Sequence, residues 1–67
     1  MAEGTVSWFD ARRGAGGIVT DHTGIEVAAH AAQIAGGGRQ SLTEGDRVVF
    51  TVFDGPTGPA AADIYVP

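Results

Sequence analysis

Side chains that could bind nucleobases and phosphates gather near the start of the chain. Trp8 and Phe9 are adjacent aromatic residues, and Arg12 and Arg13 follow them closely. An aromatic ring can stack on any base, because every base has a flat π-face, and arginines neutralise phosphates. This stretch therefore has the chemistry of a site for single-stranded nucleic acid. Strand alternation predicts that Trp8 and Phe9 lie on opposite sides of a strand, one of them in the core.

His30 and Arg39, later in the chain, could also contact bases or phosphates, and His22 and His30 are the two histidines that could bind a metal. His30 could stack on a base or donate a hydrogen bond to it, or it could be a surface histidine without a partner, and Arg39 adds a cation in a glycine-rich segment. His22 and His30 would be two metal ligands without a third, which makes a poor zinc site. We therefore expect no metal and no cofactor, and we expect His22 to lie in a turn.

The charge balance limits the class of function. The chain has four Lys and Arg residues against eight Asp and Glu residues, a net charge of −4. Tight nonspecific binding of polyanions depends on cations that displace counterions, so this balance argues against it. No serine or threonine is arranged with a histidine and a carboxylate for catalysis. We therefore expect a protein that is not an enzyme.

Length and composition predict one small domain over residues 1–67. The chain contains no cysteine, which excludes disulfides and thiolate metal sites and favours a reducing compartment. It also has no long apolar run and no lipidation signal, so we expect a cytoplasmic protein that does not bind membranes. Its stability must then come from a small apolar core.

Short apolar segments between glycines predict strands. The expected strands cover residues 4–10, 16–20, 26–30, 47–54 and 60–66, with a helical turn near 31–34, a mobile loop at 35–41 and a turn at 54–59. In the fourth strand, alternation places Val48, Phe50 and Val52 on one face and Val49 and Phe53 on the other. This arrangement predicts a small all-β barrel.

Five stretches of the chain together follow the pattern of one known family. They are Gly4-Thr5-Val6-Ser7-Trp8-Phe9, Arg13-Gly14-Ala15-Gly16-Gly17-Ile18, Val27-Ala28-Ala29-His30-Ala31, and the segments 41–50 and 58–64. Through these residues the chain resembles the bacterial cold-shock proteins over nearly its whole length, the second and third stretches matching the two ribonucleoprotein motifs. The resemblance implies a five-stranded antiparallel barrel of the oligonucleotide-binding (OB) fold, with Greek-key topology. It also implies an RNA chaperone that binds single-stranded RNA or DNA.

Apolar residues remain where the resemblance places the interior of the barrel. They are Val6, Ile18, Val27, Ile34, Val48, Phe50, Val52 and Ile64, with Ala29 as a small residue at an interior position.

The departures from the family pattern fall on the ligand face. Four phenylalanines of the two motifs are replaced by Ala15, Gly17, Ala28 and Ala31. Basic residues are replaced by Thr5 and Ser7, and a loop aromatic is replaced by Arg39. By resemblance, Trp8, Phe9 and His30 keep the chemistry for base contacts, and Arg13 keeps a cationic role. At about 1 to 3 kcal/mol a ring, the four missing rings would cost on the order of 4 to 10 kcal/mol of binding free energy.

Two functions of different kinds remain open from the sequence. One is weakened binding of single-stranded RNA or DNA by Trp8, Phe9, Arg12, Arg13, His30 and Arg39. The other is a degenerate domain that no longer binds nucleic acid. It would contact a protein partner or form a homodimer, through the face without rings or through the side of Val49 and Phe53.

Overall fold

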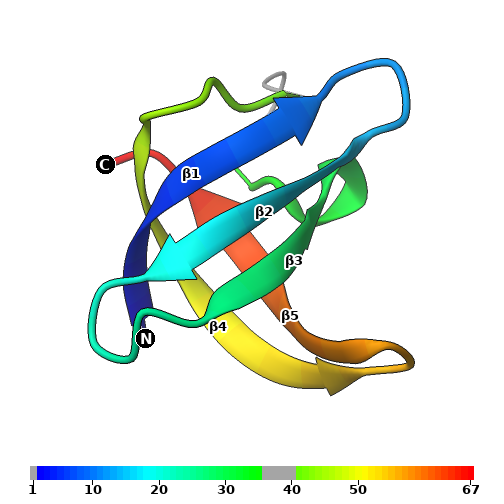
Figure 1. Ribbon diagram of the computed structural model, residues 1–67. Coiled ribbons are helices and arrows are strands. Elements are labelled where there is room, and N and C mark those ends of the chain that lie inside the picture. Colours follow the sequence, from blue (N-terminus) through cyan, green and yellow to red (C-terminus); the bar gives the residue numbers. More distant parts are fainter. Residues whose placement is uncertain (1, 36–40) are drawn as a thin grey trace.

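Each predicted strand segment forms a strand (Figure 1). The structure is a computed structural model that describes residues 2–35 and 41–67. Its strands are β1 (Ala2–Asp10), β2 (Ala15–Thr20), β3 (Glu26–His30), β4 (Arg47–Gly55) and β5 (Gly58–Tyr65), and the predicted helical turn is the 3-10 helix η1 (Ala31–Gln33). Most of the predicted loop 35–41, including Arg39, lies outside the described residues.

The strands close into a barrel in the order β1-β2-β3-β5-β4, and pairing of β1 with β4 completes the ring. The five-stranded all-β barrel predicted from the sequence is therefore confirmed. One pairing differs from the antiparallel prediction, because β3 and β5 run parallel, with Ala28 opposite Ala60. These two strands are not consecutive in the chain, so no hairpin forces them to run in opposite directions.

The core fills the interior of the barrel. Its buried residues are Val6, Ile18, Val27, Ala29, Leu42, Val48, Phe50, Ala61 and Ile64. Most of the predicted interior is confirmed, and Ile34 packs against this cluster while remaining partly exposed. Leu42 and Ala61 were not predicted, because Leu42 lies outside any strand and alanine carries little apolar signal.

The prediction that Val52 belongs to the core was wrong. Val52 is 44% exposed, whereas Phe50, two residues earlier on the same strand, is 1% exposed. Among the described residues, β1 pairs with β4 as far as Phe50, and the rest of β4 pairs with β5 alone. β4 and β5 thus continue as a hairpin past the edge of β1, at the lower right of Figure 1. Beyond this edge the barrel is no longer closed, so a side chain at an alternate position of β4, such as that of Val52, does not enter its interior.

The turn between β4 and β5 is shorter than predicted. The strands continue through most of the predicted turn at 54–59, and Asp54 pairs with Pro59. Only Pro56 and Thr57 remain between the strands. Gly58 has a φ of +128°, a conformation that side chains other than glycine rarely adopt, which allows so tight a turn.

Candidate functional site

A β-bulge in β1 decides where the two adjacent aromatic rings point. Val6 pairs with Ile18 and Trp8 with Gly17, so Ser7 is an extra residue in β1. After the bulge, Trp8 lies on the outside of the barrel, 44% exposed, and Phe9 is half-buried against the core. Of the two rings, Phe9 is thus the one that faces the core, which it packs against while remaining partly exposed, and Trp8 is the exposed ring.

Trp8 lies close to the backbone of Gly17 on the neighbouring strand. A Cβ atom at Gly17 would be 2.7 Å from Nε1 of Trp8 and 2.8 Å from the carboxyl carbon of Glu26. These distances are shorter than real Cβ contacts, so any side chain at this position would displace the indole or the carboxylate. Because Gly17 has no side chain, the indole of Trp8 has room to lie against this part of the outer surface.

Small and polar side chains occupy the rest of the outward side of β2 and β3. The side chains of Glu26, Ala28 and His30 are exposed, and they alternate with buried Val27 and Ala29. On β2, Ala15 and Gly17 lie on the same side of the sheet, two positions apart. We call the surface made by Trp8, Ala15, Gly17, Glu26, Ala28 and His30 the platform face.

Glu26 is a member of the platform face that sequence reasoning missed. Its Oε1 accepts a hydrogen bond of 2.7 Å from Oγ of Ser7, which also lies 3.3 Å from the carbonyl oxygen of Gly17. The carboxylate is exposed and close to Trp8 through their shared contact with Gly17. It places a negative charge on the platform face beside Trp8. The pairing of β3 with β2 creates this neighbourhood, and no local pattern indicates it.

The two arginines of the first motif lie in the turn between β1 and β2. Oδ1 of Asp10 accepts hydrogen bonds from the backbone N–H groups of Arg12 and Arg13, at 3.0 and 3.4 Å. Gly14 closes this turn with a φ of +66° and donates to the carbonyl oxygen of Asp10. Both arginines are exposed, and within residues 2–35 and 41–67 neither guanidinium forms an ion pair. They remain available to phosphates at one end of the platform face.

Arg47, by contrast, is paired. Its guanidinium donates to both carboxylate oxygens of Asp21, at 2.8 and 2.5 Å, and to Oγ1 of Thr5 at 3.0 Å. The hydrogen bond from Arg47 lowers the pKa of Asp21 below its usual value. Asp21 therefore stays ionised near neutral pH, and the pairing is lost only as the pH falls through that lowered pKa. This arginine is therefore engaged by Asp21 and Thr5, which are not members of the platform face.

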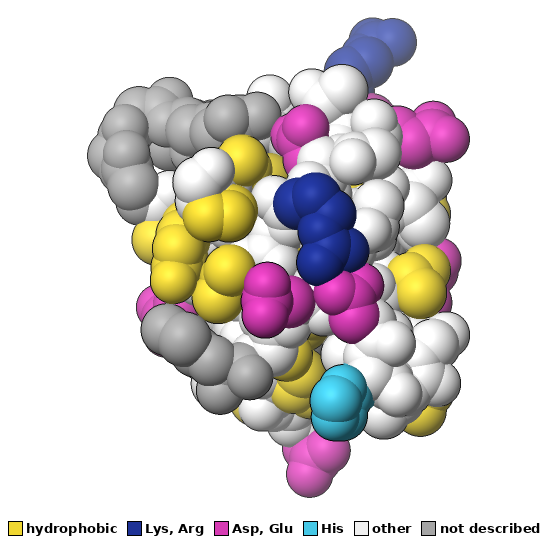
Figure 2. All heavy atoms as spheres, turned by 90° about the vertical axis from the view of Figure 1, so that its left-hand side faces the viewer, with side chains coloured by type: hydrophobic (Ala, Val, Ile, Leu, Met, Phe, Trp, Pro, Cys, Tyr) yellow, Lys and Arg dark blue, Asp and Glu magenta, His cyan; other side chains and the backbone are white. Residues whose placement is uncertain are grey.

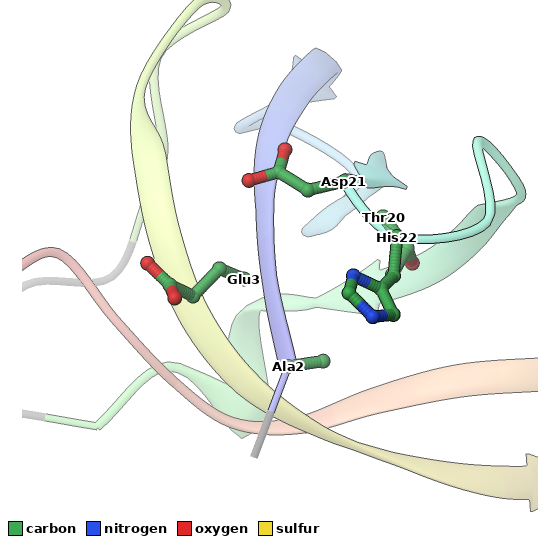
Figure 3. Close-up of a pocket in the computed structure, with 5 residues that line it drawn as sticks. All are labelled: Ala2, Glu3, Thr20, Asp21 and His22. Carbon is green, nitrogen blue, oxygen red and sulfur yellow. The ribbon is translucent and has the colours of Figure 1, made fainter.

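A hollow lies beside Asp21. It has a volume of about 440 Å³ and is lined by Ala2, Glu3, Thr20, Asp21 and His22. The side chains of Glu3 and Asp21 both extend toward the left of the view in Figure 3, and the His22 ring lies to the right of β1. In the part of the chain that the structure describes, no three His, Asp or Glu side chains are grouped to hold a metal ion. His22 lies in a turn, as predicted.

Acidic side chains flank a basic one on the side of the barrel at the left of Figure 1, as Figure 2 shows. Such a surface offers little attraction to a polyanion. Arg12 and Arg13, which form no ion pair among the described residues, lie in the turn between β1 and β2. Among the described residues, no helix is long and apolar enough to cross a membrane.

The barrel, the two motifs on β2 and β3 and the exposed Trp8 agree with a comparison against protein families. The cold-shock DNA-binding domain matches residues 2–67. The chain belongs to this family. The cold-shock domain family binds nucleic acid and is not a family of enzymes, and the present chain is a small nucleic-acid-binding protein of the cold-shock type.

Individual cold-shock proteins are similar over almost the full chain. The major cold shock protein of Micrococcus luteus is 44% identical over 64 residues, which cover 96% of both chains. The major cold shock protein of Streptococcus pyogenes serotype M1 is 45% identical over 64 residues, covering 96% of this chain and 94% of the relative. Cold shock protein ScoF of Streptomyces coelicolor is 42% identical over 64 residues, 96% of each chain.

Proposed function

We propose that this cold-shock domain binds single-stranded RNA or DNA on the platform face, with low affinity and strong dependence on salt. The observation that carries the proposal is the composition of that face. Trp8 is exposed on it, with two unpaired arginines at its end, while Ala15, Gly17 and Ala28 leave most of it without rings. We further propose that the protein acts in the cytoplasm and has no catalytic activity.

The residues of the proposed site divide into rings and cations. Trp8 and His30 supply stacking surfaces, and Phe9 contributes the exposed part of a ring that mainly packs on the core. Arg12 and Arg13 neutralise phosphates, a role that we also propose for Arg39. Because each stacking ring contributes about 1 to 3 kcal/mol, a face with one fully outward aromatic ring binds weakly, and the arginines supply much of the affinity.

Glu26 weakens this site further, which gives a test of where the strand binds. A phosphate passing Trp8 at roughly 4 to 8 Å from the carboxylate is repelled by about 0.5 to 1 kcal/mol in water. Glu26→Gln removes the charge and keeps an oxygen that can accept the hydrogen bond from Ser7. We expect this variant to bind an oligothymidylate about two to five times more tightly at low salt, and the gain to shrink as salt is added. Quenching of Trp8 fluorescence measures the affinity.

Glu3→Gln is the matched control, because it changes the net charge by the same amount. Glu3 lies four residues before Ser7 on β1, which is roughly 13 Å along a strand and beyond the screening length at physiological salt. We therefore compare the two variants at physiological salt, where Glu3→Gln is expected to bind like the parent and Glu26→Gln to keep a reduced gain. Equal gains from both variants would show that only net charge matters, and would count against binding beside Trp8.

A further inference from the structure

A groove runs along the edge of the platform face, between the end of β3 and the hairpin of β4 and β5. It has a volume of about 350 Å³, which is near the lower end for clefts that hold small ligands. Ala28 and His30 line it from β3, and Phe53, Pro56 and Ala60 line it from the hairpin. The groove therefore joins the platform face directly, because Ala28 and His30 belong to both.

Phe53 is the aromatic wall of this groove. It is 42% exposed, pairs with Ala60 on β5 and lies on the part of β4 that extends past β1. Strand alternation predicted that Phe53 lies on the outside of β4, but it did not indicate which residues of β3 lie near it. In the barrel, β3 pairs in parallel with β5, with Ala28 opposite Ala60. Because Ala60 also pairs with Phe53, this pairing brings β3 close to the ring.

The chemistry of the lining favours one kind of occupant. Among the described residues that line the groove, none is Lys, Arg, Asp or Glu, and His30 is the only titratable side chain. An uncharged groove offers a phosphate no counterion, whereas a ring, an imidazole and small apolar side chains suit the flat face of a base. The small Ala28 and Ala60 leave the space open for an object as thin as a base.

We infer that the groove holds one unpaired base of a strand bound on the platform face, stacked against Phe53. The inference rests on the proposed function, because the strand must first lie across Trp8 and His30. Phe53 then becomes a binding residue on the hairpin, and it extends the site beyond β1, β2 and β3.

The test is to remove the ring and to measure binding through Trp8, which does not line the groove. For Phe53→Ala we expect about 5- to 150-fold weaker binding of an oligothymidylate of about six nucleotides at low salt, the usual cost of one stacking ring. Phe53→Tyr keeps the ring and should bind within about twofold of the parent. Val52→Ala is the matched control, because Val52 is the exposed neighbour and does not line the groove.

The outcomes separate this inference from the proposed function. If the parent quenches on titration and Phe53→Ala binds equally well, the groove holds no base, while the platform face still binds the strand. If Val52→Ala weakens binding as much as Phe53→Ala, a general change in the hairpin is responsible, and the inference fails. If sedimentation shows a parent dimer that Phe53→Ala dissociates while binding is unchanged, a second copy covers the groove instead. A parent that shows no binding at low salt overturns both.

Discussion

Replacing Phe50 by alanine is expected to lower the free energy of unfolding by about 3 to 5 kcal/mol, the usual cost of deleting a buried ring. Phe50 is 1% exposed and is among the largest fully buried side chains in the described core. Domains are typically stabilised by about 0.05 to 0.15 kcal/mol a residue, or roughly 3 to 10 kcal/mol for a chain of this size. The variant should therefore be largely unfolded or melt far below the parent, as circular dichroism on heating will show.

Phe53→Ala is the internal control for this experiment. The same ring is deleted three residues later on the same strand, where it is 42% exposed and outside the buried cluster. We expect a much smaller fall in Tm than for Phe50→Ala. A Phe50→Ala variant that melts within a few degrees of the parent would show that this ring does not hold the barrel together.

Restoring rings on the platform face and in the adjoining η1 is expected to give the largest gain in affinity. Ala15 lies on the platform face, Ala31 follows His30 at the start of η1, and both are half-buried alanines. Gly17 is less suitable, because a Cβ there would meet Nε1 of Trp8 at 2.7 Å, and a ring at Ala28 would fill the groove beside Phe53. At about 1 to 3 kcal/mol a ring, the Ala15→Phe, Ala31→Phe double variant should bind oligothymidylate at least about 30-fold more tightly.

A control with leucine at both positions separates stacking from added apolar bulk. Ala15→Leu with Ala31→Leu enlarges the same side chains without a π-face, so we expect it to gain much less than the phenylalanine variant. Melting curves of both variants establish that the barrel is intact. A folded phenylalanine variant that binds no better than the parent would mean that the face is not a stacking surface, and would favour contact with a protein partner.

Local patterns in the sequence predicted most of the fold. The expected strand 26–30 coincides with β3, because Val27 and Ala29 alternate with outward residues between clear turns. The helical turn after it was predicted from its alanines and the hairpin of β4 and β5 from its glycines and prolines. Val52 was wrongly predicted to be in the core, because alternation along β4 does not show where its pairing with β1 ends. That end depends on how the strands close into the barrel.

Only the parts of the candidate site that lie close together in the sequence could be predicted. Trp8 and the turn arginines follow from the first motif, and the missing rings follow from the resemblance to cold-shock proteins. Glu26 was missed, and Phe53 was considered only as a contact for a protein partner or a homodimer. Both depend on another strand, because Glu26 is hydrogen-bonded to Ser7 on β1 and Phe53 lines a groove with His30 on β3. The bulge at Ser7, which turns Trp8 outward, is likewise set by the register of β1 against β2.

Fluorescence titration of the parent protein tests the central claim most directly. Trp8 is the only tryptophan, so quenching by oligothymidylate or a mixed RNA oligomer reports from the platform face itself. We predict quenching with a Kd above about 1 μM at physiological salt, and a log–log salt slope of about −0.7 for each phosphate that the arginines neutralise. Submicromolar affinity at physiological salt, or no quenching even at low salt, would contradict weak binding on this face.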